Sequence, residues 1–289
     1  MIHKYPKLLF LSVIFFAAAV VLGISSALQP SGKLKVSFLN IGQGDSILVV
    51  SPTGGKMIID GGSSRKILSE LGKALHFYER DIDIVVGTHP DKDHIGGLFH
   101  LMDSYKTGVF IDPGSHSATD FDELLRKKAG DLKIPYVIGK AGMRIDLGGG
   151  ANFYVLYPDR DVSKVKETNE TSIVGVLIYG GKRFLFTGDA PKDVEDYLTF
   201  KNSGILRADV LKVGHHGSKT STSPVFLSAV KPAVAVISVG EGNQYHHPNE
   251  EVLNLMQKLK IPLFRTDKNG RITTAVENET LKTETEDQN

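Results

Sequence analysis

A run of four potential metal ligands, placed directly after an apolar segment, limits the folds open to this chain more than any other feature. The run reads Thr88-His89-Pro90-Asp91-Lys92-Asp93-His94, and residues 82–86 before it have the length and the Ile and Val content of a buried strand. On a loop at a strand end, alternate side chains converge on one point, and imidazole nitrogens with carboxylate oxygens suit Zn²⁺, Mn²⁺ or Fe ions. Gly96-Gly97 then let the backbone pack closely where the next helix begins. Exposed polar loops often contain Asp and His as well, so the case for a metal site depends on further ligands elsewhere.

Ligand-type residues recur after three later segments that have the pattern of strands. These motifs are Thr187-Gly188-Asp189 after residues 183–186, Gly214-His215-His216-Gly217-Ser218 after residues 210–213, and Tyr245-His246-His247-Pro248 after residues 233–238. Each motif alone is compatible with a turn, a helix cap or a surface loop. Together they place acids and imidazoles at the same edge of a sheet, which is where α/β folds build their sites.

Strand and helix patterns alternate along the whole body of the chain. Apolar runs and alternating patterns between turn-forming residues predict strands at 34–39, 46–50, 56–59, 82–86, 153–157, 173–179, 183–186, 210–213 and 233–238. A helical period predicts helices at 67–78, 191–198, 224–230 and 249–259. Short strands interleaved with helices favour one layered α/β domain over residues 31–277. The last residues, 278–289, are polar and acidic and are predicted to form a disordered tail.

The first thirty residues have the pattern of a secretory signal peptide or a membrane anchor. Lys4 and Lys7 precede an uncharged apolar run over residues 8–24, and Ser25-Ser26-Ala27 offers a small-x-small cleavage site. The run is near the lower length limit for spanning a bilayer, so an uncleaved anchor stays open beside cleavage. A buried core helix would carry polar residues on one face, and this run carries none. Export therefore places the body of the chain outside the cell or at the outer face of the cytoplasmic membrane.

The charge balance excludes a broad nucleic-acid-binding surface. The chain carries 34 Lys and Arg against 33 Asp and Glu, and without Lys4 and Lys7 the remainder has one more acid than bases. Any contact with nucleic acid must therefore be local. The chain has no cysteine, which excludes disulfides and thiolate metal ligands.

Taken in order, these motifs resemble the metallo-β-lactamase superfamily, and within it the hydrolase domain of ComEC-type DNA-uptake proteins. The superfamily signature His-x-His-x-Asp-His is matched by His89-x-Asp91-x-Asp93-His94, with Asp91 in place of the second His. The resemblance runs from about residue 33 to residue 276 and includes Asn40-Ile41-Gly42-Gln43-Gly44-Asp45-Ser46, Asp60-Gly61-Gly62, Thr187-Gly188-Asp189, Leu211-Lys212-Val213-Gly214-His215-His216-Gly217-Ser218 and His247-Pro248. It implies an αββα sandwich, here preceded by one N-terminal hydrophobic helix in place of the long run of membrane helices in ComEC proteins.

The resemblance also implies a site for two divalent ions, Zn²⁺ or Mn²⁺. It implies that one ion is held by His89 and Asp91, the other by Asp93 and His94, and both by a bridging Asp189. Many relatives have a further metal-binding His before the Gly-Asp motif, but residues 168–172 of this chain contain none. The ligand set is therefore rich in oxygen, which is compatible with Mn²⁺ as well as with Zn²⁺.

The remaining histidines leave alternatives open. His247 is expected to complete the second metal site, with His215 as a close rival. His216 is then expected to be the catalytic group that donates a proton or binds a substrate oxygen. Ser218 and Lys219 are expected to bind substrate, with help from Lys212.

The implied function is an exported, metal-dependent phosphodiesterase or nuclease that acts on DNA in competence-type uptake. A cell-wall or lipid phosphodiester, such as a choline or teichoic-acid ester, is the alternative substrate. β-Lactam hydrolysis uses the same chemistry but fits an oxygen-rich ligand set poorly. The alternative of another class is a non-catalytic binding module that retains the fold, against which the near-complete ligand set argues. The membrane is a partner if the N-terminal segment stays uncleaved, and no protein partner is implied.

Overall fold

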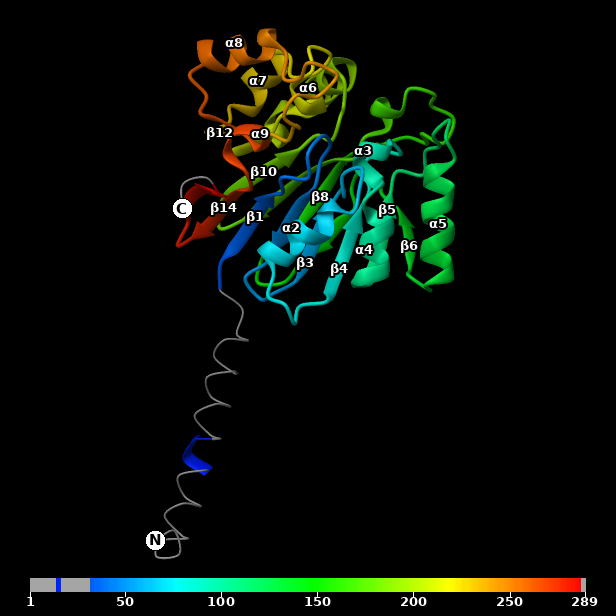
Figure 1. Ribbon diagram of the computed structural model, residues 1–289. Coiled ribbons are helices and arrows are strands. Elements are labelled where there is room, and N and C mark those ends of the chain that lie inside the picture. The colour runs from blue at the N-terminus through cyan, green and yellow to red at the C-terminus, as the bar shows by residue number, and fades with distance from the viewer. Residues whose placement is uncertain (1–13, 17–31, 287–289) are drawn as a thin grey trace, which may run out of the picture.

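Two β-sheets packed face to face form the centre of the molecule, and helices cover both outer faces (Figure 1). The structure is a computed structural model that describes residues 14–16 and 32–286. Its layers confirm the αββα arrangement expected from the sequence. The segment predicted to be a signal or anchor, residues 1–30, lies outside the described residues except for 14–16. Within the described part of the chain, no helix combines the length and the apolar character needed to cross a membrane.

The first sheet has eight strands in the order β15-β14-β1-β2-β3-β4-β5-β6. Their bounds are Leu34–Phe38 for β1, Ile47–Val50 for β2, Lys56–Ile59 for β3, Asp81–Val86 for β4, Lys106–Asp112 for β5, Tyr136–Ile138 for β6, Ile272–Glu277 for β14 and Thr280–Thr285 for β15. The strands from β3 to β6 are parallel, and the other pairs are antiparallel. Because β14 pairs with β1, the end of the chain completes the sheet that its beginning started (Figure 1).

The second sheet has seven strands in the order β13-β12-β11-β10-β9-β8-β7. Their bounds are Arg144–Asp146 for β7, Asn152–Tyr157 for β8, Val174–Tyr179 for β9, Lys182–Phe186 for β10, Val210–Lys212 for β11, Val234–Ile237 for β12 and Leu263–Arg265 for β13. The strands from β10 to β13 are parallel. Both sheets therefore contain a block of parallel strands whose carboxyl ends carry loops at one edge.

Apolar side chains fill the space between the sheets and beneath the helices. Between the sheets, Phe186 packs against Phe38 and Phe153, with ring centroids 6.4 and 6.3 Å apart. Outside the first sheet, the helices are α2 (Lys66–Ala74), α4 (Leu98–Ser104) and α5 (Phe121–Asp131). Outside the second sheet, they are α6 (Lys192–Leu206), α7 (Pro224–Val230) and α8 (Glu250–Lys258). The short helices are α3 (Lys92–Ile95), α9 (Thr266–Asn269), η2 (Thr168–Thr171) and η3 (Gly214–Gly217).

The end of the chain departs from the prediction. Residues 280–285, expected to belong to a disordered tail, form β15 and pair with β14 along their whole length. Thr280, Lys282 and Glu284 are exposed, whereas the residues between them are at least partly covered. The segment is polar because it is an edge strand with one face in solvent, and its threonines favour extended structure. Apart from a helix that begins after Gly97, the sequence predicts no element in residues 98–152 or 260–277, where the structure has two helices and three strands in the first range and two strands and a short helix in the second.

Candidate metal centre

The loops that follow parallel strands of both sheets meet at one edge of the sandwich and carry most of the candidate ligands. In the first sheet, Asp60 follows β3 and His89 follows β4. In the second sheet, Asp189 follows β10 and His216 follows β11. Asp93 and His94 belong to the short helix α3, and Asp45 precedes β2. A Cβ atom on Gly97, just after α3, would lie 1.9 Å from the carbonyl oxygen of Gly61, so only glycine lets this turn pack against the end of β3.

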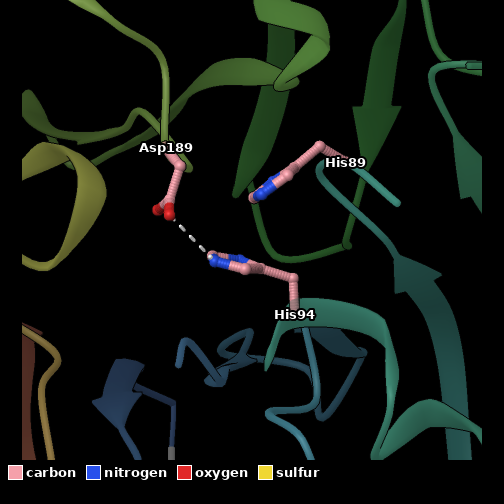
Figure 2. Close-up of side chains that lie close together, drawn as sticks. All are labelled: His89, His94 and Asp189. Atoms are coloured by element: carbon pink, nitrogen blue, oxygen red, sulfur yellow. Dashed lines mark ion pairs between the residues drawn. The ribbon is translucent and has the colours of Figure 1, made fainter. Parts of the chain in front are cut away.

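The first compact group consists of His89, His94 and Asp189. Figure 2 shows the imidazoles of the first sheet pointing toward the carboxylate of the second. The Nε2 atom of His94 lies 3.2 Å from Oδ2 of Asp189, and the two imidazole centroids are 4.1 Å apart. All three side chains are buried, and one ligand atom from each lies within 4.8 Å of the others. This spacing suits the ligands of a single ion.

A second compact group lies beside the first and contacts the same oxygen of Asp189. The Nε2 atom of His216 lies 3.3 Å from Oδ2 of Asp189 and 3.4 Å from Oδ2 of Asp93. Asp93, His94 and His216 form this group, which shares His94 with the first. Oδ2 of Asp189 faces imidazoles of both groups, and the two oxygens of this carboxylate offer enough lone pairs to serve both.

Asp60 fixes the orientation of two imidazoles. The Nδ1–H group of His94 donates to Oδ2 of Asp60 over 2.8 Å. The Thr88 hydroxyl donates to the same carboxylate over 2.7 Å, so its oxygen is free to accept from Nδ1–H of His89 over 3.0 Å. In their neutral forms both imidazoles therefore have the tautomer in which the Nε2 lone pair is available. Outer partners of this kind orient the histidines of metal sites.

The inner atoms of the cluster have no hydrogen-bond partners. His216 is held in the same way as the other two imidazoles, because its Nδ1–H group donates to the carbonyl of Ser238 over 2.9 Å. The Nε2 atoms of His89, His94 and His216, together with Oδ1 of Asp189, are buried without a hydrogen-bond partner among the described residues. A buried polar atom left unpaired costs about 1–3 kcal/mol, so four of them in one cluster require an explanation. Divalent metal ions fit, because they bind nitrogen and carboxylate lone pairs of this kind.

The charges of the cluster also favour cations. Burial alone would lower the pKa of His94 and of His216, but neighbouring carboxylates, above all Asp189, outweigh it and raise both pKa values well above the usual range. Burial alone would raise the pKa of Asp189, but His216 and His94 hold it well below the usual range. Four acids surround these imidazoles, namely Asp45, Asp60, Asp93 and Asp189. Divalent ions would replace the imidazole protons and balance this negative charge.

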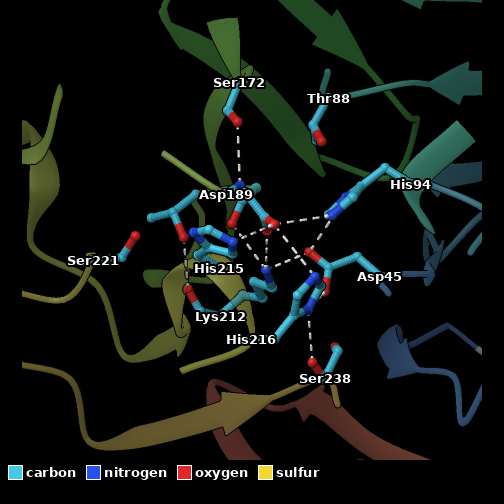
Figure 3. A network of polar contacts seen from close by, with 12 residues as sticks. Asp45, Thr88, His94, Ser172, Asp189, Lys212, His215, His216, Ser221 and Ser238 are labelled. Atoms are coloured by element: carbon cyan, nitrogen blue, oxygen red, sulfur yellow. Dashed lines mark hydrogen bonds and ion pairs between the residues drawn. The ribbon is translucent and has the colours of Figure 1, made fainter. Parts of the chain in front are cut away.

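Lys212 is a buried cation behind Asp189, and its expected role as a substrate ligand is wrong. Figure 3 shows its amino group among the carboxylates: it forms an ion pair with Asp45, donates to the carbonyl of Gly188 over 2.9 Å and lies 3.6 Å from Oδ1 of Asp189. Its side chain is 0% exposed, so a substrate arriving from solvent cannot touch it. The carboxylate of Asp45 outweighs the effect of burial and raises the pKa of Lys212, which therefore stays charged.

The three later histidines do not take the places that the sequence analysis expected. His216, expected to be the catalytic group, lies among the candidate metal ligands, because η3 turns its side chain inward. His215 lies at the rim, with Nε2 3.8 Å from Oδ2 of Asp189 and Nδ1 3.0 Å from the Thr220 hydroxyl. His247 belongs to no compact ligand group of the described residues and contacts His215 edge to face, at 5.6 Å between centroids.

The structure places the other predicted site residues at the margin of the cluster. Asp91 is partly exposed, and its Oδ2 lies 3.7 Å from Nε2 of His89, at the side where the ligand set is poorest in histidine. Ser218 is buried, and its hydroxyl forms a hydrogen bond with that of Thr220 in the same loop. Lys219 is exposed in the same loop, outside the ligand groups.

Two acids of the site, Asp45 and Asp60, were not singled out as site residues by the sequence analysis. Asp60 stands directly after β3, the same strand-end position that drew attention to His89 after β4, and that signal was in the sequence. Asp45 precedes its strand and reaches the site through a close approach of two loops. A Cβ atom on Gly44, whose φ is +114°, would lie 2.0 Å from the carbonyl oxygen of Asp93. Only tertiary structure reveals this contact.

His216, which lies among the candidate ligands, and His247, which lies outside them, give a direct test. Replacing His216 with Ala is expected to lower metal affinity by more than the roughly 10–100-fold that loss of an outer partner costs, because the variant loses an inner nitrogen. Replacing His247 with Ala is expected to leave metal content unchanged, since its ring lies outside the ligand groups. Metal content per chain, measured after dialysis, compares the two variants. If the His216 variant keeps its full metal content and the His247 variant loses metal, His247 is the ligand, as the sequence predicted.

Comparisons with known proteins agree with this geometry. The profile of the Metallo-beta-lactamase superfamily matches residues 39–241. The chain is 34% identical over 261 residues to ComE operon protein 3 of Bacillus subtilis (strain 168), covering 84% of this chain and 33% of that protein. It is 32% identical over 244 residues to Competence protein ComA of Neisseria gonorrhoeae, covering 84% of this chain and 32% of that protein. The chain thus spans about a third of the length of these relatives.

A solved structure supports the fold independently of sequence identity. The metallo-beta-lactamase fold protein YhfI from Bacillus subtilis aligns with a TM-score of 0.56 at 12% identity, over 87% of this chain and 99% of that one. The superfamily match covers most of the sandwich, and its motifs lie at the carboxyl-end loops where the two ligand groups meet. The chain belongs to the metallo-β-lactamase superfamily and is related there to the ComEC-type competence proteins.

Proposed function

We propose that this protein is a two-metal phosphodiesterase that cleaves DNA. The observation that carries the proposal is the set of three buried imidazoles, His89, His94 and His216, whose Nε2 atoms gather at the Asp189 carboxylate and have no hydrogen-bond partner among the described residues. A binding module that merely retained the fold would have no reason to keep these costly unpaired atoms.

The ligands divide between two ions around one shared carboxylate. His89 and Asp91 would hold one ion, Asp93, His94 and His216 would hold the other, and Asp189 would contribute to both. Two divalent ions, when bound, supply a nucleophile by lowering the pKa of water and stabilise charge on the phosphate oxygens. Each ion would have two carboxylate ligands, but the first would have one imidazole ligand and the second two, so the first site would accept Mn²⁺ as well as Zn²⁺.

His215 takes the catalytic role that the sequence analysis gave to His216. Its side chain is 24% exposed and reaches within 3.8 Å of Asp189, so it borders both solvent and the ligand groups. The Thr220 hydroxyl holds its Nδ1 atom and thereby directs Nε2 toward the space above the cluster. From there it donates a hydrogen bond or a proton to a phosphate oxygen of the substrate.

The relatives support DNA as the substrate. Two proteins named for competence are 34% and 32% identical to this chain, although it covers about a third of each. We place the enzyme outside the cytoplasmic membrane, where incoming DNA is met, and the apolar run at residues 8–24 is the proposed export signal or anchor. A reporter active only outside the cytoplasm, fused after residue 32, should give signal. A signal from a cytoplasmic reporter alone would refute export.

A metal-reconstituted activity screen tests the proposed reaction. Protein loaded with Mn²⁺ or Zn²⁺ is offered plasmid DNA, a bis-aryl phosphodiester, a choline phosphodiester and a β-lactam. Cleavage of DNA and of the bis-aryl ester is expected, without turnover of the β-lactam. Preference for the choline ester would establish the cell-wall or lipid alternative. A protein that takes up no metal under these conditions would be a binding module.

A further inference from the structure

Two hollows lie side by side on the surface beside the metal centre. The first, of about 390 Å³, reaches the candidate ligand Asp93 and the exposed Tyr245. The second, of about 570 Å³, extends over the beginning of α2 and the flank of α4. Ser63 and Lys92 line both hollows, so the two form one groove that leads away from the metal centre.

This groove is positively charged, although the chain as a whole is nearly neutral. Arg65, Lys66 and Lys92 are exposed and line it, and Asp93 supplies the one carboxylate of the lining. Across residues 14–16 and 32–286, none of these three cations forms an ion pair with a carboxylate. Burial lowers the pKa of His100 in the same hollow, and the Arg65 guanidinium lowers it further. Cations that gather in a hollow and form no ion pair with a carboxylate attract a polyanion.

Aromatic rings lie at both ends of the groove. At the metal end, Tyr245 is 55% exposed, and its ring stacks on His247 with centroids 5.9 Å apart. At the far end, Phe99 and Phe121 are half-buried, with centroids 5.1 Å apart. Cations that follow a backbone, combined with aromatic faces on which bases stack, are the means by which proteins hold single-stranded nucleic acid. A polyphosphate chain without bases would leave these aromatic faces unused.

We propose that this groove binds one strand of nucleic acid, with its phosphates along Lys92, Arg65 and Lys66 and its bases against Tyr245 and the two phenylalanines. The inference rests on the proposed function, because the metal centre defines where the cleaved phosphate lies. Along this groove the bound strand runs from the metal centre toward the beginning of α2. The strand is single, because paired bases are not free to stack on protein side chains.

A binding experiment without metal tests the cations of the groove. The double variant Arg65→Ala/Lys66→Ala is titrated with a labelled single strand of about 12 nucleotides in EDTA, so that no cleavage occurs. Its Kd is expected to rise about tenfold at low salt, and the slope of log K against log salt to fall by about 1.4, because each phosphate contact of a single strand contributes about 0.7. The control Arg207→Ala/Lys258→Ala removes the same charges from exposed positions over the other sheet and should bind as the parent does. Equal affinity of the groove variant and the parent would overturn the proposal.

A second pair of variants tests base stacking. Tyr245→Ala is expected to weaken binding of the strand by about 5- to 150-fold, whereas Tyr245→Phe keeps the ring and should bind as the parent does. Inorganic polyphosphate at equal phosphate concentration should compete poorly. Competition as effective as that of the oligonucleotide would show a polyanion site without base recognition and would overturn the nucleic-acid assignment.

Cleavage of a bis-aryl phosphodiester by the metal-loaded parent separates this inference from the proposed function. If the parent cleaves the ester and the groove variant binds the strand as tightly as the parent does, the groove proposal is wrong and the proposed function stands. If the parent cleaves no phosphodiester but the groove variant still binds the strand more weakly than the parent does, the groove proposal stands and the proposed reaction is wrong.

Discussion

Replacing Asp189 with Asn should remove most of the bound metal and lower kcat/KM on a bis-aryl phosphodiester by about 10³–10⁴-fold. The Asp189 carboxylate faces both His94 and His216, within 3.2 and 3.3 Å of their Nε2 atoms, and in our proposal it is shared by both ions. Asn keeps the shape but loses the charge, and its amide nitrogen cannot bind a cation. A metal pair contributes several kcal/mol to the transition state, and each 1.36 kcal/mol is a factor of ten in rate.

The control for this variant is Asp193→Asn, which makes the same chemical change at an exposed position in the first turn of α6. It should retain metal content and turnover. Metal per chain is measured after dialysis, and thermal unfolding in EDTA confirms that both variants fold. An Asp189→Asn variant that holds as much metal as the parent and turns over substrate at the same rate would show that the bridging ligand lies elsewhere.

The location of the site followed from sequence because it depends on local rules. Ligand residues directly after apolar strands must lie at the carboxyl edge of a parallel sheet, whatever the details of packing. The predictions for His89, Asp93, His94 and Asp189 used this rule, and the structure brings these four side chains together. Assigning them individually to ions remains a proposal.

The choice among the three later histidines did not follow from sequence, because it depends on the conformation of one loop. His215 and His216 both have positive φ, at 47° and 52°, between Gly214 and Gly217. In this conformation adjacent side chains diverge, one toward the rim and one toward the ligands. No spacing rule distinguishes two neighbouring histidines in an irregular turn, and positive φ at residues other than glycine is itself uncommon.

The position of the Lys212 side chain also did not follow from the sequence. Its position near His215 in the sequence favoured a role in phosphate binding, but it is the last residue of β11 and points into the protein. A lysine at a buried strand position requires a buried carboxylate, and its partner Asp45 lies far away in the sequence, in a loop of the other sheet. Only the packing of the two sheets brings these residues together.

Lys212→Met should therefore lower the free energy of unfolding by about 3–5 kcal/mol, the usual cost of removing one partner from a buried ion pair. Met fills most of the space of the Lys side chain, so the loss comes from the buried Asp45 carboxylate, which loses its lysine partner and keeps the more distant His94 and His216, and not from a cavity. Domains are stable by only about 5–15 kcal/mol, so the change is a large fraction of the total. For a domain of this size it corresponds to a fall in Tm of roughly 6–20 °C. Denaturant unfolding in EDTA measures the change without a contribution from bound metal.

A double-mutant cycle separates the ion pair from other effects of the substitution. Asp45→Asn alone leaves the Lys212 charge buried without its partner, and should be destabilising by a similar amount. The double variant Lys212→Met/Asp45→Asn removes both charges. Its loss of unfolding free energy should therefore be smaller than the sum of the two single losses by a coupling energy of at least about 1 kcal/mol. Strict additivity, or a single variant as stable as the parent, would show that the pair does not stabilise the fold. Because the Lys212 amino group also lies 3.6 Å from Asp189, the double variant should bind metal more weakly than the parent even where its fold has recovered, since Asp189 then lacks the neighbour that helps to fix its carboxylate.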